Sequence, residues 1–194
     1  MSARKHSPGI FWFCLKFLVL LIPLLWLWWT LVPYYGQVLL QASGGVLKYL
    51  FGMPIVAGVV EPKEILNTGT KLTFHLSNGH HPSMTIALLV TNLPPYLALV
   101  LATGGLAFWK RMRILLYGTL ILCAGHILFI IVALRFQAQL MKISEIPTAT
   151  VQFFLTLPFM LWIVFAYWDK IMAAASGESK TPVTAEKSNS KPAE

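Results

Sequence analysis

Two long apolar runs joined by a short basic segment constrain this chain more than any other feature. The runs occupy residues 85–136, and the segment between them reads Lys110-Arg111-Met112-Arg113. Apolar runs of this length are typical of membrane-spanning helices, and cytoplasmic loops carry an excess of lysine and arginine. The pattern predicts a helical hairpin in a membrane, with its basic segment at the cytoplasmic face.

The composition agrees with a single membrane domain. Of the 194 residues, 57% are hydrophobic and 11% are charged, whereas about a quarter are charged in a typical soluble domain. The net charge of +8 does not favour nucleic-acid binding, because the basic residues flank the apolar runs. Cys14 and Cys123 lie inside apolar runs, which favours buried thiols over a disulfide or a metal site. No cofactor is expected.

The first apolar run predicts a transmembrane helix over residues 10–33, after a short cytoplasmic N-terminus, residues 1–9. The run is too long for a signal peptide, and no small-residue cleavage site follows it. Residues 36–52 carry one narrow polar stripe, which indicates a helix lying on the outer interface. A second crossing at this point would place the basic segment outside, against the positive-inside rule.

Residues 34–91 are expected to form an extracytoplasmic segment, with strands between residues 54 and 91. The stretch 71–77 alternates polar and apolar side chains with a period of two, and Asn78-Gly79 after it is a turn signal. The run 85–91 is also strand-like and leads directly into the next helix. These patterns predict a small β-element of two or three strands.

Three further transmembrane helices are predicted, over residues 93–110, 112–135 and 147–169. Thr91 or Asn92 can cap the first of these, and Pro158 should bend the last. Residues 174–194 cannot bury a core and are predicted to be a disordered cytoplasmic tail. The fold class is therefore an all-α integral membrane protein with four transmembrane helices, an interfacial helix and a small extracytoplasmic β-element. The membrane domain covers residues 10–173, and both termini are expected in the cytoplasm.

Several histidines are candidates for chemistry. His126 lies near the middle of the predicted helix 112–135, where an ionisable side chain is costly and is often functional. The alternative is a neutral histidine that hydrogen-bonds a neighbouring helix. His75, His80 and His81 lie near a predicted turn, where adjacent histidines point in different directions, and solvated side chains are favoured over a metal site.

The segment Thr91-Asn92-Leu93-Pro94-Pro95 predicts a polar corner between strand and helix at the outer membrane face. A nucleophile there would have a helix N-terminus behind it, which favours a thiolate. No cysteine or serine stands at the corner, and Thr91 has no nearby histidine in sequence to activate it. The corner is either a helix cap or a surface that contacts a substrate or partner.

This layout resembles the exosortase and archaeosortase family, the bacterial and archaeal membrane transpeptidases that process carboxy-terminal sorting signals. In that family a strand leads into an ACSG-like motif at the outer face, and the following helix descends to a basic inner loop. Here the strand is TIALLVT, the corner TNLPP, the loop WKRMR and the rising helix LILCAGHILFIIVALRF. The resemblance covers roughly residues 56–168 and concerns layout more than identity.

The chain departs from that family where the family carries its catalytic residues. The cysteine position falls at about Thr91-Asn92, and the region of the family's Asn and Arg holds His126, with Arg135 later. Gln152 lies where a late histidine is expected. No catalytic role carries over, and what remains is similar to the shorter membrane proteins associated with exosortase H. The resemblance thus implies a pseudoenzyme of the bacterial inner membrane.

Such a pseudoenzyme is expected to bind an exosortase-type sorting enzyme, or the carboxy-terminal anchor of its substrate. The residues expected to contact the partner or substrate are Thr91, Asn92, Tyr96, His126, Arg135 and Gln152. Two other functions stay open. A small transporter or channel subunit is one, although the chain lacks the intramembrane acids and the inverted repeat that many carriers show. An atypical membrane transpeptidase is the other, although Thr91 and His126 are expected at different depths.

Overall fold

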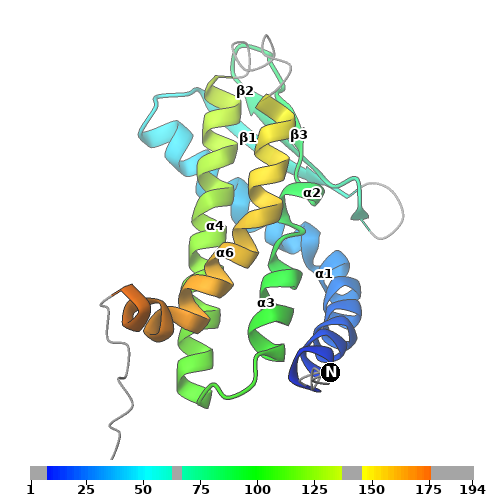
Figure 1. Ribbon diagram of the computed structural model, residues 1–194. Coiled ribbons are helices and arrows are strands. Elements are labelled where there is room, and N and C mark those ends of the chain that lie inside the picture. Colours follow the sequence, from blue (N-terminus) through cyan, green and yellow to red (C-terminus); the bar gives the residue numbers. More distant parts are fainter. Residues whose placement is uncertain (1–7, 63–66, 137–145, 176–194) are drawn as a thin grey trace, which may run out of the picture.

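The computed structural model describes residues 8–62, 67–136 and 146–175. The elements are α1 (Pro8–Tyr49), β1 (Ile55–Glu61), β2 (Lys71–Leu76), β3 (Ser83–Thr85), α2 (Ala87–Val90), α3 (Leu93–Ala102), α4 (Phe108–Arg135) and α6 (Ile146–Ala175). The three-stranded sheet lies at one end of the helices, and the α3–α4 connection lies at the other (Figure 1). The predicted combination of a helical body with a small β-element is confirmed.

α1 is one continuous helix of 42 residues, so the predicted break between a helix over 10–33 and another over 36–52 is wrong. Pro33 lies inside α1 and has no N–H to donate to the carbonyl of Trp29, four residues earlier. The side-chain amide of Asn67, in the segment before β2, donates to that carbonyl at 3.1 Å. The carbonyl is therefore satisfied, and the helix continues across the proline.

The second half of α1 packs on the sheet. At 1.5 Å per residue α1 is about 63 Å long, twice the roughly 30 Å of a hydrocarbon core. A Cβ on Gly36 would lie 3.1 Å from the side chain of Ile86, and one on Gly58 of β1 would lie 2.8 Å from Leu40. These two glycines let the helix and the sheet approach closely. The polar stripe of this half remains exposed, at Gln37, Gln41 and Lys48.

The sheet is antiparallel, with the strand order β1-β2-β3. The strand predicted over 71–77 is confirmed as β2, and the turn after it contains Gly79 at a φ of 79°. The strand expected over 85–91 is wrong beyond Thr85, because Ala87–Val90 form the short helix α2. A short apolar run fits a strand or a buried helix equally well, and here the packing decides.

The connection between α3 and α4 is placed differently from the prediction. α3 ends at Ala102, well before the predicted end at residue 110, and its 10 residues span about 15 Å. The basic segment 110–113 belongs to the first turns of α4. Gly105 supplies the connection itself with a φ of 75°, a conformation that suits glycine. Arg111 reaches back and donates to the carbonyl of Thr103 at 2.9 Å.

α6 extends beyond both ends of the predicted helix 147–169 and contains Pro158, as predicted. Its C-terminal turns, orange in Figure 1, point away from the other helices. Residues 174 and 175 therefore belong to α6 and not to the predicted tail. The rest of that tail and residues 1–7 lie outside the described residues.

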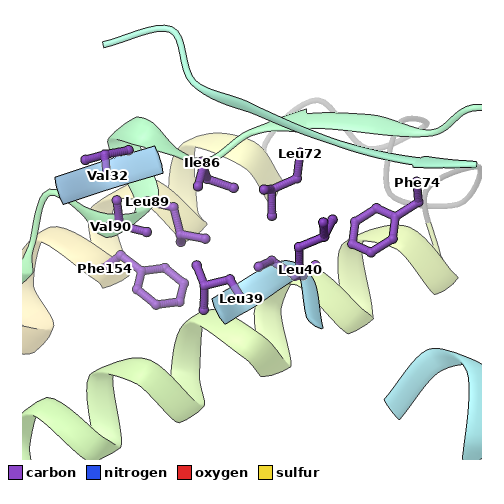
Figure 2. Close-up of a cluster of buried hydrophobic side chains, with 10 residues drawn as sticks. Val32, Leu39, Leu40, Leu72, Phe74, Ile86, Leu89, Val90 and Phe154 are labelled. Atoms are coloured by element: carbon purple, nitrogen blue, oxygen red, sulfur yellow. The ribbon is translucent and has the colours of Figure 1, made fainter. Parts of the chain in front are cut away.

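Two clusters of buried side chains hold the helices and the sheet together. The first joins α1, β2, α4, α6 and the segment around α2 (Figure 2), with Val32, Leu39, Leu40, Leu72, Phe74, Ile86, Leu89, Val90, Ile130 and Phe154. The second lies between α3 and α4, with Leu93, Tyr96, Val100, Ile114 and Leu122. Trp28, Tyr35 and Leu157 pack against both clusters, so α1 and α6 connect them.

Within the part of the chain that the structure describes, two helices are long and apolar enough to cross a membrane, Gly9–Tyr49 and Phe108–Arg135. The apolar helical stretches Ala87–Ala102 and Gln152–Trp168 are shorter. By length and composition the structure therefore gives two candidate spans, and a count of four spans stays a prediction.

Candidate functional site

Four helices meet at one buried series of hydrogen bonds, which we call the polar chain: Phe154, Asn92, His126, Tyr35 and Cys123. The Asn92 side chain, at the start of α3, contacts the carbonyl of Phe154 in α6 at 3.4 Å and Nε2 of His126 in α4 at 3.0 Å. Nδ1 of His126 lies 2.8 Å from the hydroxyl of Tyr35 in α1. That hydroxyl lies 3.1 Å from Sγ of Cys123, one turn before His126.

A proline creates the first acceptor of the polar chain. In a regular helix the carbonyl of Phe154 would accept from the N–H of residue 158, but residue 158 is proline. The amide of Asn92 supplies the missing donor from another helix. Pro158, which is expected to bend α6, and Asn92 at the polar corner are therefore linked through the same carbonyl.

The Phe154 carbonyl fixes the direction of the other hydrogen bonds. A carbonyl can only accept, so it faces the Nδ2 group of Asn92, and Oδ1 of Asn92 faces His126. Nε2 of His126 therefore carries the proton, and Nδ1 of the neutral ring accepts from the Tyr35 hydroxyl. The same hydroxyl also lies 3.1 Å from Sγ of Cys123.

The centre of the polar chain is shielded from solvent, whereas Tyr35 and Cys123 are half-buried. His126 is 0% and Asn92 3% exposed. The rings of Tyr35 and Phe154 flank the imidazole, with centroids 5.9 and 5.6 Å away. Both ring nitrogens and both ends of the amide are satisfied, which avoids the cost of buried unpaired polar groups. Chemically, the arrangement can orient four helices, but His126 can accept a substrate's proton only after one of its hydrogen bonds breaks.

Tyr96 lies one turn along α3 from Asn92 but faces the interior between α3 and α4. It is 0% exposed, and its hydroxyl donates to the carbonyl of Ile114. The ring occupies the space beside Gly118, where a Cβ would lie 1.8 Å from the hydroxyl oxygen. Gly118 is therefore the position that lets α3 and α4 approach with a tyrosine between them.

Asn92 occupies the N-cap position of α3, but its side chain makes no capping hydrogen bond. The expected cap is therefore wrong. An N-cap side chain accepts from the N–H of the second or third helical residue, and here these residues are Pro94 and Pro95, which have none. The amide is left free to join the polar chain.

The remaining predicted site residues lie outside the polar chain. Thr91 is half-buried, and its hydroxyl donates to the carbonyl of Ala87 within the same helical segment. Arg135 and Gln152 are exposed, and the Arg135 guanidinium lies 5.8 Å from the ring of Phe136. The structure thus brings Asn92 and His126 together and leaves Arg135 and Gln152 on the surface, where a partner could reach them.

Sequence reasoning missed Tyr35, Cys123 and Phe154 as members of the polar chain. One signal for Cys123 was present, because residues three apart share a face of a helix and Cys123 precedes His126 by three. A signal for Phe154 was its position four residues before Pro158. Nothing in the sequence pointed to Tyr35, which lies 91 residues from His126.

A second group of histidines lies on the β2–β3 hairpin. Nδ1 of His75 and Nδ1 of His81 are 2.8 Å apart, so these two rings converge. The backbone N–H of His80 donates to Oδ1 of Asn78. Within residues 8–62, 67–136 and 146–175 no three His, Cys, Asp or Glu side chains are placed to hold a metal ion.

Comparisons of the chain with protein-family models, with curated proteins and with solved structures find no match.

Proposed function

We propose that this protein is a non-catalytic membrane partner in an exosortase-type sorting system, with four transmembrane helices and both termini in the cytoplasm. The sheet is then extracytoplasmic, and the basic segment 110–113 lies at the cytoplasmic face. The first turns of α1 and the α3–α4 connection lie at the same end of the molecule, opposite the sheet, which supports this orientation (Figure 1). It satisfies the positive-inside rule at the start of α4.

Exposed apolar side chains support a membrane location. Ile10 and Ile22 on α1 are each 70% exposed, Leu128 on α4 is 62% exposed, and Met160 on α6 is 59% exposed. No residue in the most apolar window of α1 is buried, and a third of the window in α4 is buried. Soluble proteins rarely expose such continuous apolar surface, whereas lipid requires it.

The proposal that the protein is non-catalytic is supported by the hydrogen bonds of His126 and Asn92, which both residues make inside the polar chain. A general base must reach the proton of a bound substrate. His126 instead contacts Asn92 through one nitrogen and Tyr35 through the other, with no exposed surface. The residues at the corner therefore act as an assembly point for the four helices.

Partner contact then belongs to exposed residues near the sheet. Arg135 ends α4, and Gln152 lies in the first turns of α6. These ends of the two helices lie beside the sheet (Figure 1). A guanidinium suits a carboxylate of the sorting enzyme or of its substrate's anchor, and we assign the contact to this region.

Co-expression with a cysteine-bearing exosortase-type enzyme tests the proposal. The tagged protein should retain the enzyme through purification in mild detergent, and Arg135→Gln should lower the amount recovered. Arg113→Gln is the matched control, because it makes the same change on an exposed arginine at the opposite end of α4. Equal recovery with both variants, or no recovery with the wild-type chain, would contradict the proposal.

The thiol in the polar chain favours one alternative, an atypical membrane transpeptidase. Cys123 is half-buried, and its thiol is connected through Tyr35 to His126, so a nucleophile and a base lie on one hydrogen-bonded series. Thr91 is not part of it, since its hydroxyl is bonded to Ala87. Peptide cleavage or transfer by the purified protein that is lost in Cys123→Ala would replace the partner proposal with this one.

A further inference from the structure

β2 directs alternate backbone groups to its two neighbours. The N–H of Phe74 donates to the carbonyl of Pro82 on the β3 side, so the even-numbered residues of β2 bond β3 and the odd-numbered ones bond β1. Odd residues pair with odd residues in the β1–β2 register from residue 57 onwards. The N–H and C=O groups of Gly58 and Val60 therefore point away from β2, along the outer edge of the sheet.

β1 has few of the features that protect a sheet edge, namely a charged last residue, Glu61, and an irregularity in register between Ile55 and Ala57. Proteins guard long edge strands with charged side chains, proline, or a covering segment. Residues 55–60 carry neither a charge nor a proline, and Val56 and Val59 are 72% and 43% exposed. Between described residues, no hydrogen bond to the outward groups of Gly58 or Val60 is formed. An edge of this kind is a template for another strand.

A groove of about 300 Å³ runs between this edge and the second half of α1. Four of the residues that line it have small side chains or none, Gly44 and Gly45 of α1 and Ala57 and Gly58 of β1. Lys48 provides a cation at the groove, and its ammonium lies 5.9 Å from the ring centroid of the neighbouring Tyr49. The other polar lining side chains are Gln37 and Gln41, which can donate and accept hydrogen bonds.

We infer that β1 binds an extended peptide segment of a partner protein as an added strand, with a carboxylate of that segment at Lys48. The outward backbone groups require an extended chain, the glycines leave room for its side chains, and the exposed ammonium selects an anion. The inference rests on the sheet edge and the groove beside it, so it holds whether or not the partner belongs to a sorting system.

A second copy of this chain fits the groove less well. Pairing two β1 edges would bring together two chains of net charge +8 and would give neither Lys48 an anion. A peptide with a carboxylate supplies both the backbone partner and the missing charge.

Peptide probes test the inference on the full-length protein in lipid nanodiscs. The parent probe is a labelled peptide of alternating valine and threonine, seven residues long like β1, with a free terminal carboxylate. We expect it to bind, measured by fluorescence anisotropy. The same peptide with alternate amides N-methylated should bind about tenfold more weakly or worse, because it cannot pair with the edge. Equal binding of both peptides, or no binding of either, would overturn the inference.

Variants test the role of Lys48. In Lys48→Gln the carboxylate peptide should bind about threefold more weakly, the effect expected of one exposed ion pair, and an amidated peptide should bind as it does to wild type. Lys71→Gln is the control, because it removes the same charge from β2 away from the groove. Equal loss in both variants would show only long-range attraction and would overturn the placement of the carboxylate. A wild-type dimer in which the peptide cannot bind would identify a second copy as the occupant instead.

Discussion

Replacement of Asn92 by alanine should destabilise the folded protein by more than the loss of an ordinary helix cap. The change removes the hydrogen bonds of Asn92 to the buried carbonyl of Phe154 and to Nε2 of His126. An unsatisfied buried group costs about 1–3 kcal/mol in soluble proteins. Hydrogen bonds between membrane helices are weaker, about 0.6 kcal/mol on average and at most about 1.7. Two losses amount to about 2–6 kcal/mol on the soluble scale and about 1–3 kcal/mol on the membrane scale, and we expect about 2 kcal/mol.

The adjacent Thr91→Ala is the matched control. Its hydroxyl bonds a carbonyl within its own helical segment, so the loss should change the free energy of unfolding by less than about 0.5 kcal/mol. Unfolding of the purified protein in mixed micelles, followed by tryptophan fluorescence as a denaturing detergent is added, measures both variants. Equal stability of Asn92→Ala and Thr91→Ala would refute the assignment of the polar chain as the contact that holds the helices.

A double-mutant cycle with Pro158→Ala isolates one of the two hydrogen bonds. Alanine at residue 158 restores an N–H to the carbonyl of Phe154 inside α6, which makes that part of the role of Asn92 redundant. Asn92→Ala should then cost about 1 kcal/mol less in the Pro158→Ala background than in the wild-type chain. Strictly additive effects would show that Asn92 does not act through this carbonyl.

Two further predictions concern helix packing and topology. Gly118→Ala should lower the free energy of unfolding by about 3 kcal/mol, because its Cβ would lie 1.8 Å from the Tyr96 hydroxyl. Gly125→Ala is the control: its Cβ would meet its nearest neighbour at 3.6 Å, and the variant should be nearly neutral in the same assay. Equal stability of the two variants would place the tyrosine elsewhere. A cysteine introduced at Asn78 should react with an impermeant reagent outside the cell, and one at Ser176 only after the membrane is opened. Labelling of Ser176 from outside would exclude the four-span orientation.

Local pattern was enough to predict the parts of the fold in which one face is buried. The period of two in β2 and the Asn78-Gly79 turn both correspond to observed elements, because each depends on residues adjacent in sequence. The run 85–91 was ambiguous, since Ile86, Ala87, Leu89 and Val90 are all buried and periodicity cannot separate a strand from a helix there. Its conformation is decided by packing against α1 and α6, which the sequence does not specify locally.

Only half of the candidate site could be predicted from the sequence, for a related reason. His126 and Asn92 drew attention because polar side chains are costly beside apolar runs, and the structure places them 3.0 Å apart. Their separation in sequence is 34 residues, and the partners Tyr35 and Phe154 come from two other helices. Composition identifies which groups need a partner, but the identity of the partner depends on how four helices pack.

Prolines inside helices help to predict which buried groups need a partner from another element. A proline identifies one carbonyl, four residues earlier, that needs a donor from elsewhere. In this protein Pro33 leaves the carbonyl of Trp29 to Asn67, and Pro158 leaves that of Phe154 to Asn92. The two asparagines precede β2 and α3, so each of these two prolines joins its helix to a segment distant in sequence. Replacing either asparagine should therefore loosen contacts between elements, which gives the prolines a role in assembling the fold as well as in bending helices.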